Sequence, residues 1–313
     1  MALSDIIDKL SCSLADALGT GLRGCDFNFE NMESIAILPS GTAIPASAAY
    51  DRDYIRSLQK SGQWIPLNRV YSFDWQTGDD EVETSDTKGI EAVTRKGLYK
   101  FEVMFRNGIY QQKVLNSLEG FGRWDVIFFD EDGNQLHVTT SSGGIRGFST
   151  GRFSVSPIEF KNGKNSLKTR LTVQFTKTSQ FNNDIGFVGA DDLTFNPDEI
   201  EGVNQARLSI PTAPANAATD IVVKTVLDKD GSTFVTGLVD ANFLVKVDGA
   251  TVAATAVADA NAKTYTLTVP ALNTGQVVTV DLYDTPGVTP VIEVGQSPDD
   301  ILYQAKTATT TVV

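Results

Sequence analysis

The stretch Trp124-Asp-Val-Ile-Phe-Phe-Asp-Glu-Asp-Gly-Asn134 decides how the larger part of this chain folds. Residues 124–129 form a short, strongly apolar run, which is typical of a strand whose two faces are both covered. The dipeptide Asp132-Gly133 that follows favours a tight hairpin turn. The stretch therefore predicts a buried strand that turns back into a second strand.

Further strands are predicted on both sides of this hairpin. Apolar side chains occupy every second position in residues 99–105 and again in residues 171–175, the period of a strand with one buried face. Residues 153–160 continue the apolar pattern around Pro157, which predicts an edge strand or a bulge there. Two polar stretches, 77–89 and 139–151, are predicted to be long loops.

Three helices are predicted between these strands. Apolar residues recur at helical spacing from Leu3 to Leu18, with Ser4 as a possible N-cap and Gly19 as a stop. A second helix is expected over 52–60, capped by Asp51, and a third over 109–118 with Tyr110, Val114 and Leu118 on one face. Strands and helices together predict an α+β N-terminal domain, with a sandwich-like or barrel-like sheet and a flanking helix.

A change in composition divides the chain. Every arginine and tryptophan lies at or before Arg207, and residues 210–219 form a Pro- and Ala-rich stretch that is typical of a linker. We therefore expect a domain over 1–208 with an N-terminal arm, a linker over 209–219 and a second domain over 220–313.

The second domain is predicted to be an all-β, immunoglobulin-like sandwich. Seven short β-branched runs are separated by turn residues, which suits six or seven strands in two sheets. The runs are Ile221–Leu227, Thr233–Leu238, Phe243–Val247, Thr251–Val257, Thr264–Val269, Val277–Tyr283 and Val291–Val294. Residues 249–269 and 275–283 resemble the Ig-like modules of bacterial and phage proteins.

Composition excludes several classes of function. The 313 residues carry a net charge of −13 and a single histidine. Such a charge argues against a groove for nucleic acid or an anionic membrane, and one histidine removes most histidine-based active sites and zinc sites. Asp5 and Asp8 interrupt the apolar start, which predicts no secretory leader and therefore free thiols at Cys12 and Cys25.

Four groups of polar residues are candidate sites. The stretch from Asp130 to Gly133 has glycine at loop position 4 and Ser141 at position 12, which does not fit an EF-hand and favours a hairpin turn. Acidic clusters at other positions favour solvated loops over a metal site, because no histidine or ligand spacing accompanies them. They comprise Asp79, Asp80, Glu81, Glu83, Asp86, Asp191, Asp192, Asp198, Glu199 and Glu201.

The stretch from Ser141 to Gly147 lacks the Lys-Ser/Thr ending of a phosphate-binding loop, so a flexible loop between strands is preferred. His137 lies among strand formers without a nucleophilic serine motif, which favours a structural role. No carboxylate pair is singled out for glycoside hydrolysis. The prediction is therefore no catalytic residues, no cofactor and no metal site.

The order of these features resembles a family. The Trp124–Asn134 hairpin is followed by Gly143-Gly-Ile-Arg-Gly-Phe-Ser-Thr-Gly151, by a strand that ends in Val155-Ser-Pro157, and by a detachable Ig-like domain. A polar arm, an acidic loop and a helix between strand pairs precede them. This arrangement resembles virion structural proteins of tailed bacteriophages, especially tail tube proteins with a C-terminal Ig-like domain.

The resemblance implies a non-enzymatic subunit that forms stacked hexameric rings. Its partners would be further copies of itself and other tail proteins, with DNA as passing cargo that is not bound. Residues 1–50 and 77–89 would lie across adjacent rings, and residues 220–313 would offer weak contact with host glycans. The location would be the virion tail, with assembly in the host cytoplasm.

Three other classes compete with this interpretation. A capsid decoration or head-associated protein would bind a preformed shell without forming tubes. A surface adhesin or carbohydrate-binding protein is suggested by the Ig-like part and by Tyr50, Trp64, Tyr71 and Trp75, although core positions are the commoner place for such residues. An enzyme is the least supported class, because no residue constellation indicates one.

Overall fold

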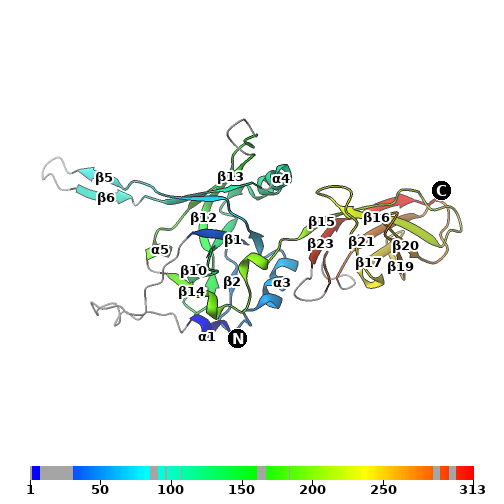
Figure 1. Cartoon of the computed structure of the whole chain (residues 1–313), viewed down its shortest axis with the longest axis horizontal. Helices are drawn as coiled ribbons and strands as arrows, with labels where there is room; N and C mark the ends of the chain where they lie inside the picture. The colour runs from blue at the N-terminus through cyan, green and yellow to red at the C-terminus, as the bar shows by residue number, and fades with distance from the viewer. Residues whose placement is uncertain are drawn as a thin grey trace. The chain divides into compact units, whose positions relative to one another are not determined.

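A computed structural model describes residues 2–7, 31–84, 91–95, 97–106, 108–160, 167–182, 184–284, 290–295 and 301–313. The chain divides into two compact units (Figure 1). Unit 1 comprises Met1–Leu58 and Gly62–Ile200, and unit 2 comprises Gln59–Ser61 and Glu201–Val313. The division after Ile200 precedes the predicted boundary at residue 208, because residues 204–209 form a strand of unit 2.

The predicted α+β character of the N-terminal domain is wrong. The structure is mostly β, with 47% strand and 13% helix, several sheets and one half-barrel. Strands form in parts of the two stretches that were predicted as loops, 77–89 and 139–151. The first predicted helix is described only over α1 (Leu3–Ile7), and the rest of that prediction lies outside the described residues.

Unit 1 is built on one large sheet, a separate two-stranded sheet formed by β5 and β6, and the helices and turns that cover the large sheet. Its strands are β1 (Met32–Pro39), β2 (Ala43–Ile44), β3 (Ile65–Leu67), β4 (Ser72–Thr77), β5 (Glu81–Thr84), β6 (Glu91–Arg95), β7 (Tyr99–Phe105), β8 (Gly120–Phe121), β9 (Trp124–Asp130), β10 (Gln135–Thr139), β11 (Ile145–Arg146), β12 (Phe148–Val155), β13 (Thr169–Phe175) and β14 (Ile185–Val188). Its helices and 3-10 turns are α1, α3 (Arg52–Lys60), α4 (Ile109–Leu118), α5 (Ser179–Asn182), η1 (Ala190–Asp192) and η2 (Pro197–Glu199).

Strand β9 lies at the centre of unit 1 and is covered on both faces, as its sequence predicts. Val126 and Phe128 point into one hydrophobic core, while Ile127 and Phe129 point into the other. One edge of β9 pairs with β1, and the other pairs with β10 near its C-terminal end and with β12 near its N-terminal end. The predicted hairpin from β9 to β10 is confirmed.

Strand β12 connects the two parts of the half-barrel. The main path runs β2-β11-β10-β9-β12-β13-β7-β4, and β12 pairs with β9 through Phe148 and Ser149 before it pairs with β13. The larger aromatic core fills the space between β9 and the strands β13 and β7. The second core lies on the other face of β9, under α1, α3 and the segment 193–200.

The two longer helices occur where the sequence predicts them. The Asp51 carboxylate accepts a hydrogen bond from the Tyr54 N–H at 2.9 Å, which caps α3. The predicted apolar face of α4 is partly wrong, because Leu115 and Leu118 are buried while Val114 is exposed. Among the described residues, no helix combines the length and the apolar composition that crossing a membrane requires.

Two glycines of the stretch 143–151 are required for close packing of main chains. A Cβ on Gly147 would lie 2.6 Å from the Val126 nitrogen, and one on Gly144 would collide with the Ile44 carbonyl oxygen. The stretch forms β11 and the start of β12, so the expected flexible loop is wrong. The predicted strand across Pro157 also ends earlier, at Val155.

We expect Gly147→Ala to destabilise the protein by about 2 kcal/mol or more, because the added Cβ meets rigid main-chain atoms of β9. Gly189→Ala is the matched control, since its φ is −69° and its nearest neighbour lies 3.9 Å from the new Cβ. Urea unfolding of both variants measures the difference. Equal stability of the two variants would contradict the packing argument.

Unit 2 is a sandwich of two sheets around one hydrophobic core. One sheet has the order β19-β20-β16-β15-β23-β22 and the other β18-β17-β21-β24. The elements are β15 (Asn204–Ser209), β16 (Asp220–Leu227), η3 (Asp240–Asn242), β17 (Phe243–Val247), β18 (Ala250–Val252), β19 (Thr255–Asp259), β20 (Thr264–Thr268), β21 (Val277–Leu282), β22 (Val291–Val294), β23 (Ile301–Lys306) and β24 (Ala308–Thr311).

Two apolar runs of unit 2 differ from their predicted form. Residues 251–257 split into β18 and β19, which belong to different sheets. Residues 233–238 form no regular strand but make an isolated bridge to β16, between Phe234 and Val226. The buried Tyr265 hydroxyl also holds this segment, by donating to the Val235 carbonyl at 3.0 Å and accepting from the Leu238 N–H at 3.2 Å. The sequence did not predict β15, β23 or β24.

Candidate assembly edge

Strand β4 presents an open edge at the end of the large sheet. It pairs with β7 along its whole length, from Ser72 opposite Met104 to Thr77 opposite Tyr99, and no other described strand pairs with it. An unpaired edge of this length offers main-chain hydrogen bonds to a further strand.

The register shows which main-chain groups of β4 are available. The Gly78 N–H donates to the Leu98 carbonyl at 3.1 Å, which makes this a hydrogen-bonded pair of the antiparallel ladder. Because hydrogen-bonded pairs alternate with non-bonded pairs, the main-chain N–H groups of Phe73, Trp75 and Thr77 point away from β7. The main-chain N–H groups of these three residues therefore point toward the open edge.

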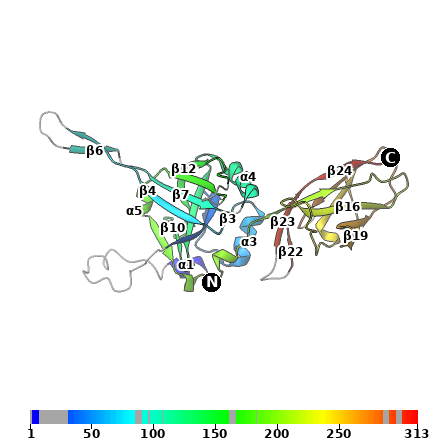
Figure 2. The ribbon, with the colours of Figure 1, turned by 45° about the horizontal axis from the view of Figure 1, so that its top comes forward.

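The hairpin β5–β6 extends this edge beyond the sheet. Glu81 lies opposite Arg95 in the same register that pairs β4 with β7, so the four strands form one long antiparallel hairpin. Figures 1 and 2 show β5 and β6 reaching away from the rest of unit 1. The expected acidic loop over 77–89 is therefore in part a projecting hairpin, and residues 85–89 lie outside the described residues.

Two glycines join the hairpin to the sheet. A Cβ on Gly97 would collide with the carbonyl oxygen of Gly78, so the two main chains approach more closely here than side chains allow. The Asp80 carboxylate accepts a hydrogen bond from the Gly97 N–H at 2.7 Å. These contacts fix the direction in which the hairpin leaves β4 and β7.

An aromatic cluster adjoins the open edge. Its members are Phe73, Trp75, Tyr99, Phe101, Phe128, Phe148, Phe175 and Phe181. At the buried end, the rings of Phe148 and Phe181 stack with centroids 4.2 Å apart. At the open end, Trp75 packs 5.2 Å from Phe181 and remains 37% exposed. Trp75 thus provides apolar surface beside the unpaired main chain.

The aromatic residues that suggested sugar binding lie in different surroundings. Tyr50 and Trp64 are buried in the second core of unit 1. Tyr71 is half-exposed, and the Arg106 guanidinium lies 3.1 Å from its ring centroid. Trp75 packs its ring against the aromatic cluster. Two of the four candidates are therefore core residues, and the other two already have packing partners.

His137 belongs to a buried polar chain. The Tyr50 hydroxyl donates to the side-chain Oε1 of Gln135 at 2.7 Å, and the side-chain Nε2 of Gln135 lies 3.3 Å from Nδ1 of His137. Complete burial lowers the pKa of His137 to about 3 and raises that of Tyr50 above its ordinary value. Both groups are therefore neutral at pH 7, in agreement with the structural role predicted for His137.

The candidate calcium stretch is a hairpin turn. The Asp130 carboxylate accepts hydrogen bonds from the main-chain N–H groups of Asp132 and Asn134 at 3.1 and 2.8 Å, and from the Asn134 side chain at 2.9 Å. Gly133 supplies the positive φ of 85° that the turn requires. The protein's own donors therefore occupy both oxygens of this carboxylate.

The remaining acidic residues do not converge on a metal site within the described part of the chain. Asp191 and Asp192 lie in η1, and Asp198 and Glu199 lie in η2. Burial raises the pKa of Asp198. Asp86, Cys12 and Cys25 lie outside the described residues.

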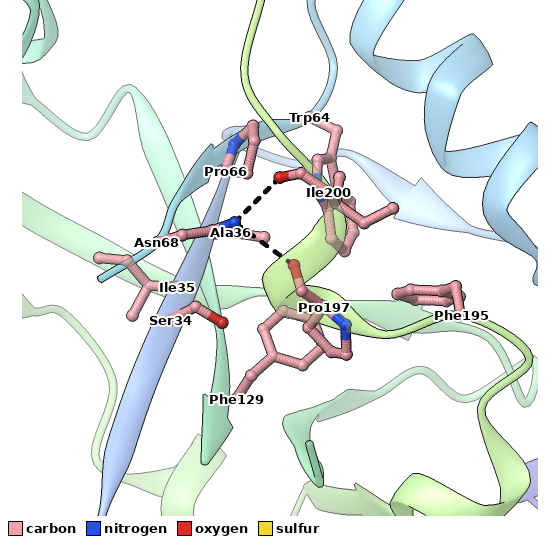
Figure 3. Close-up of a pocket in the computed structure, with 10 residues that line it drawn as sticks. All are labelled: Ser34, Ile35, Ala36, Trp64, Pro66, Asn68, Phe129, Phe195, Pro197 and Ile200. Atoms are coloured by element: carbon pink, nitrogen blue, oxygen red, sulfur yellow. Dashed lines mark hydrogen bonds between the residues drawn. The ribbon is translucent and has the colours of Figure 1, made fainter. Parts of the chain in front are cut away.

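The enclosed pocket of unit 1 is too small for a ligand. Figure 3 shows its lining, in which Asn68 reaches from the end of β3 toward the main chain around η2. The Asn68 side-chain amide donates to the carbonyl oxygens of Asp198 and Ile200 at 3.1 and 3.0 Å. At this pocket, the hydrogen bonds from Asn68 hold the segment before unit 2 against the sheet.

We expect Asn68→Ala to lower the free energy of unfolding by about 1–3 kcal/mol, because carbonyl groups around η2 lose their donor. Asn68→Asp should be at least as destabilising, since a carboxylate would face those carbonyl oxygens. Urea unfolding at pH 7 measures both. Wild-type stability of Asn68→Ala would show that the amide does not fasten this segment.

Comparisons with known proteins do not assign the chain to a family. No protein-family model matches the sequence, and no curated protein matches it.

The open edge of β4 was not among the predicted sites. Its signal in the sequence is the alternation of Phe73 and Trp75 with polar residues before an acidic stretch.

Proposed function

We propose that this chain is a non-catalytic structural subunit of a tailed-phage virion, the tail tube protein, which assembles into stacked hexameric rings. The observation that supports the proposal is the open edge of β4 and its continuation into the projecting hairpin β5–β6. The resemblance of the sequence to tail tube proteins supports it independently.

Ring closure would proceed by strand pairing at β4. Carbonyl groups of a strand from a neighbouring copy would accept hydrogen bonds from the outward N–H groups of this edge. The exposed part of the Trp75 ring would be covered at the same time. An obligate interface of this kind buries about 2,000 Å² or more in total. The hairpin would reach past the neighbour and connect successive rings.

The remaining features suit passive conduction of DNA. A net charge of −13 disfavours retention of a polyanion during passage. Other tail proteins would cap the tube at its ends, and assembly would take place in the host cytoplasm before the tail joins the virion. Unit 2 would remain available for weak contact with host glycans.

Negative-stain electron microscopy of the purified protein, with light scattering of the soluble fraction, tests the proposal. Hollow tubes or stacked rings of uniform width are the expected result. A protein that stays monomeric at high concentration would contradict the proposal. Binding of that monomer to preformed capsids or to glycans would then favour a decoration protein or an adhesin, respectively.

A further inference from the structure

Phe121 is a large apolar side chain that unit 1 presents to solvent. It is 76% exposed and lies on β8, whose main chain pairs with β12 so that Phe121 is opposite Arg152. The next residue, Gly122, has a φ of 59°, and its N–H donates to the Gly151 carbonyl at 2.8 Å. Main-chain hydrogen bonds on both sides therefore hold the ring in this outward position.

Two arginines flank the exposed ring. The guanidinium carbon of Arg152 lies 5.9 Å from the centroid of the Phe121 ring. A Cβ on Gly120 would lie 2.9 Å from Cδ of Arg123, so the aliphatic part of Arg123 passes over the residue that precedes the phenylalanine. Phe121, Arg123 and Arg152 together form a projection, called the knob below, with an apolar ring and a cation on each side.

Three carboxylates near the knob do not cancel its charge. Glu119 is adjacent and accepts a hydrogen bond from a main-chain N–H of β12 at 3.0 Å. Glu102 pairs with Arg170 at 2.9 Å, and Asp74 accepts from the Gln76 amide at 2.7 Å. These two lie on β7 and β4, two and three strand spacings from β12, or about 10 and 14 Å. Both distances exceed the Debye length of about 8 Å, so two arginines and one nearby glutamate leave the knob positively charged.

An open cavity of about 450 Å³ lies at the other end of β9. The turn between β9 and β10 forms one wall, and residues 190–198 form the other. The volume lies within the range of ligand pockets and is sufficient for an aromatic ring. Its lining combines buried apolar residues with carboxylates at the rim. They are Leu193, Phe195 and Pro197, and Glu131, Asp132 and Asp198.

The two segments that form this acidic pocket carry charge of one sign only. Residues 130–134 and 190–199 contain seven acidic residues and no lysine or arginine. Burial raises the pKa of Asp198, and the neighbouring Glu199 raises it further. A cation from another molecule would offset both effects, so the pocket favours a ligand that is apolar at its tip and positively charged beside it.

We propose that the knob of one copy of this chain inserts into the acidic pocket of another copy. The ring of Phe121 would pack against Phe195 and Pro197. Arg123 and Arg152 would face the carboxylates of the rim. The proposal rests on the proposed self-assembly and adds a second contact between copies, besides strand pairing at β4.

The positions of the two surfaces determine the kind of assembly. The knob adjoins the N-terminal end of β9 and the pocket adjoins its C-terminal end, and the seven residues of this strand span roughly 20 Å. A chain therefore does not fill its own pocket. Each copy would use its knob on one neighbour and its pocket on another, which is a head-to-tail contact that repeats from copy to copy.

Truncation of the ring tests the apolar part of the contact. We expect Phe121→Ala to raise the protein concentration needed for half-assembly by at least about tenfold, because the pocket loses the ring that fills it. Phe160→Ala is the matched control, since Phe160 is similarly exposed, at 67%. The control should assemble like the wild type, and circular dichroism should show both variants folded. Equal assembly of the two variants would overturn the proposal.

Exchange of charges tests that the contact joins two copies. Arg123→Glu with Arg152→Glu, and separately Glu131→Lys with Asp132→Lys, should each need at least about tenfold more protein to assemble, because like charges then face each other. An equimolar mixture of the two variants should recover assembly, since each knob then meets a pocket of opposite charge on the other variant. A mixture that assembles no better than its components would refute the contact.

The outcomes separate this proposal from the proposed function. Tubes that form equally well from the wild type and from Phe121→Ala would overturn the knob contact and leave the tube function intact. Open chains of copies in place of tubes, lost in Phe121→Ala and recovered in the charge-exchange mixture, would support the contact and contradict the tube function. A wild type that stays monomeric would contradict both. Normal assembly of Phe121→Ala with failure of the pocket variant would assign the pocket to a different segment of the neighbouring copy.

Discussion

The free energy of unfolding should fall as the pH is lowered from 6.5 toward 3, and His137 should account for much of the loss. Its pKa is about 3 in the folded protein, because burial disfavours the imidazolium, against an ordinary value of 6.5. Between these values the unfolded chain binds a proton that the folded chain does not. Stability is therefore fully present above pH 6.5 and is lost at up to about 1.4 kcal/mol per pH unit below it.

Urea unfolding at pH 7 and at pH 4.5 measures this effect. We expect the wild type to lose about 2–3 kcal/mol more than His137→Asn, which keeps an acceptor for the Gln135 amide but does not titrate. The comparison uses the slope of the free energy of unfolding against pH. It removes the contribution of the carboxylates, which both proteins share. Equal slopes would contradict the prediction.

A spectroscopic measurement covers the case in which His137→Asn does not fold. His137 is the only histidine of the chain, so its ring protons give an unambiguous NMR signal. In the folded wild type these shifts should stay constant from pH 8 to pH 5. Titration near pH 6.5 would show that the native ring is accessible to protons.

Local sequence patterns correctly predict the elements that depend only on residues close together in the chain. The run Val126–Phe129 has no polar position on either face, so any fold that buries it must cover both faces, and the structure does so with two cores. The helix 52–60 is equally local, because Asp51 caps it and a glycine with a φ of 71° follows it at residue 62.

Other parts could not be predicted because distant segments decide them. The stretch around Gly144 and Gly147 looks like a flexible loop in the sequence, yet the residues beside these glycines form β11 and the start of β12, where Ile44 and Val126 approach from elsewhere in the chain. Residues 204–209 join unit 2 because β16 and β23 pair with them, the latter from nearly a hundred residues further along. Local patterns predict loops in these places, and the predicted α+β class is therefore wrong.

The candidate site was likewise visible only in part. The acidic residues 79–83 and Trp75 stand out in the sequence, but their meaning depends on which edge of β4 is paired. An alternating strand pattern does not say whether a strand is central or terminal. The register with β7 supplies this information. It shows that the main-chain N–H of Thr77 points away from β7.

Thr77→Pro should weaken self-assembly by at least about tenfold while leaving the subunit folded. Proline lacks the main-chain N–H, and at residue 77 this group points away from β7, so the β4–β7 ladder loses no hydrogen bond. The substitution thus removes a donor only from the open edge. Thr77→Ala is the matched control, because it also lacks the hydroxyl but keeps the N–H.

Sedimentation velocity and electron microscopy of the two variants measure the effect. We expect Thr77→Pro to need at least about tenfold more protein for half-assembly than Thr77→Ala, which corresponds to about 1.4 kcal/mol at each interface. Circular dichroism and urea unfolding should show similar folds and stabilities for both variants. Normal tubes from a folded Thr77→Pro protein would exclude strand pairing at this edge, and the search for the ring interface would move to the exposed faces of the sheet. If both variants lose assembly, the contact depends on the Thr77 side chain and the strand-pairing mechanism is again wrong.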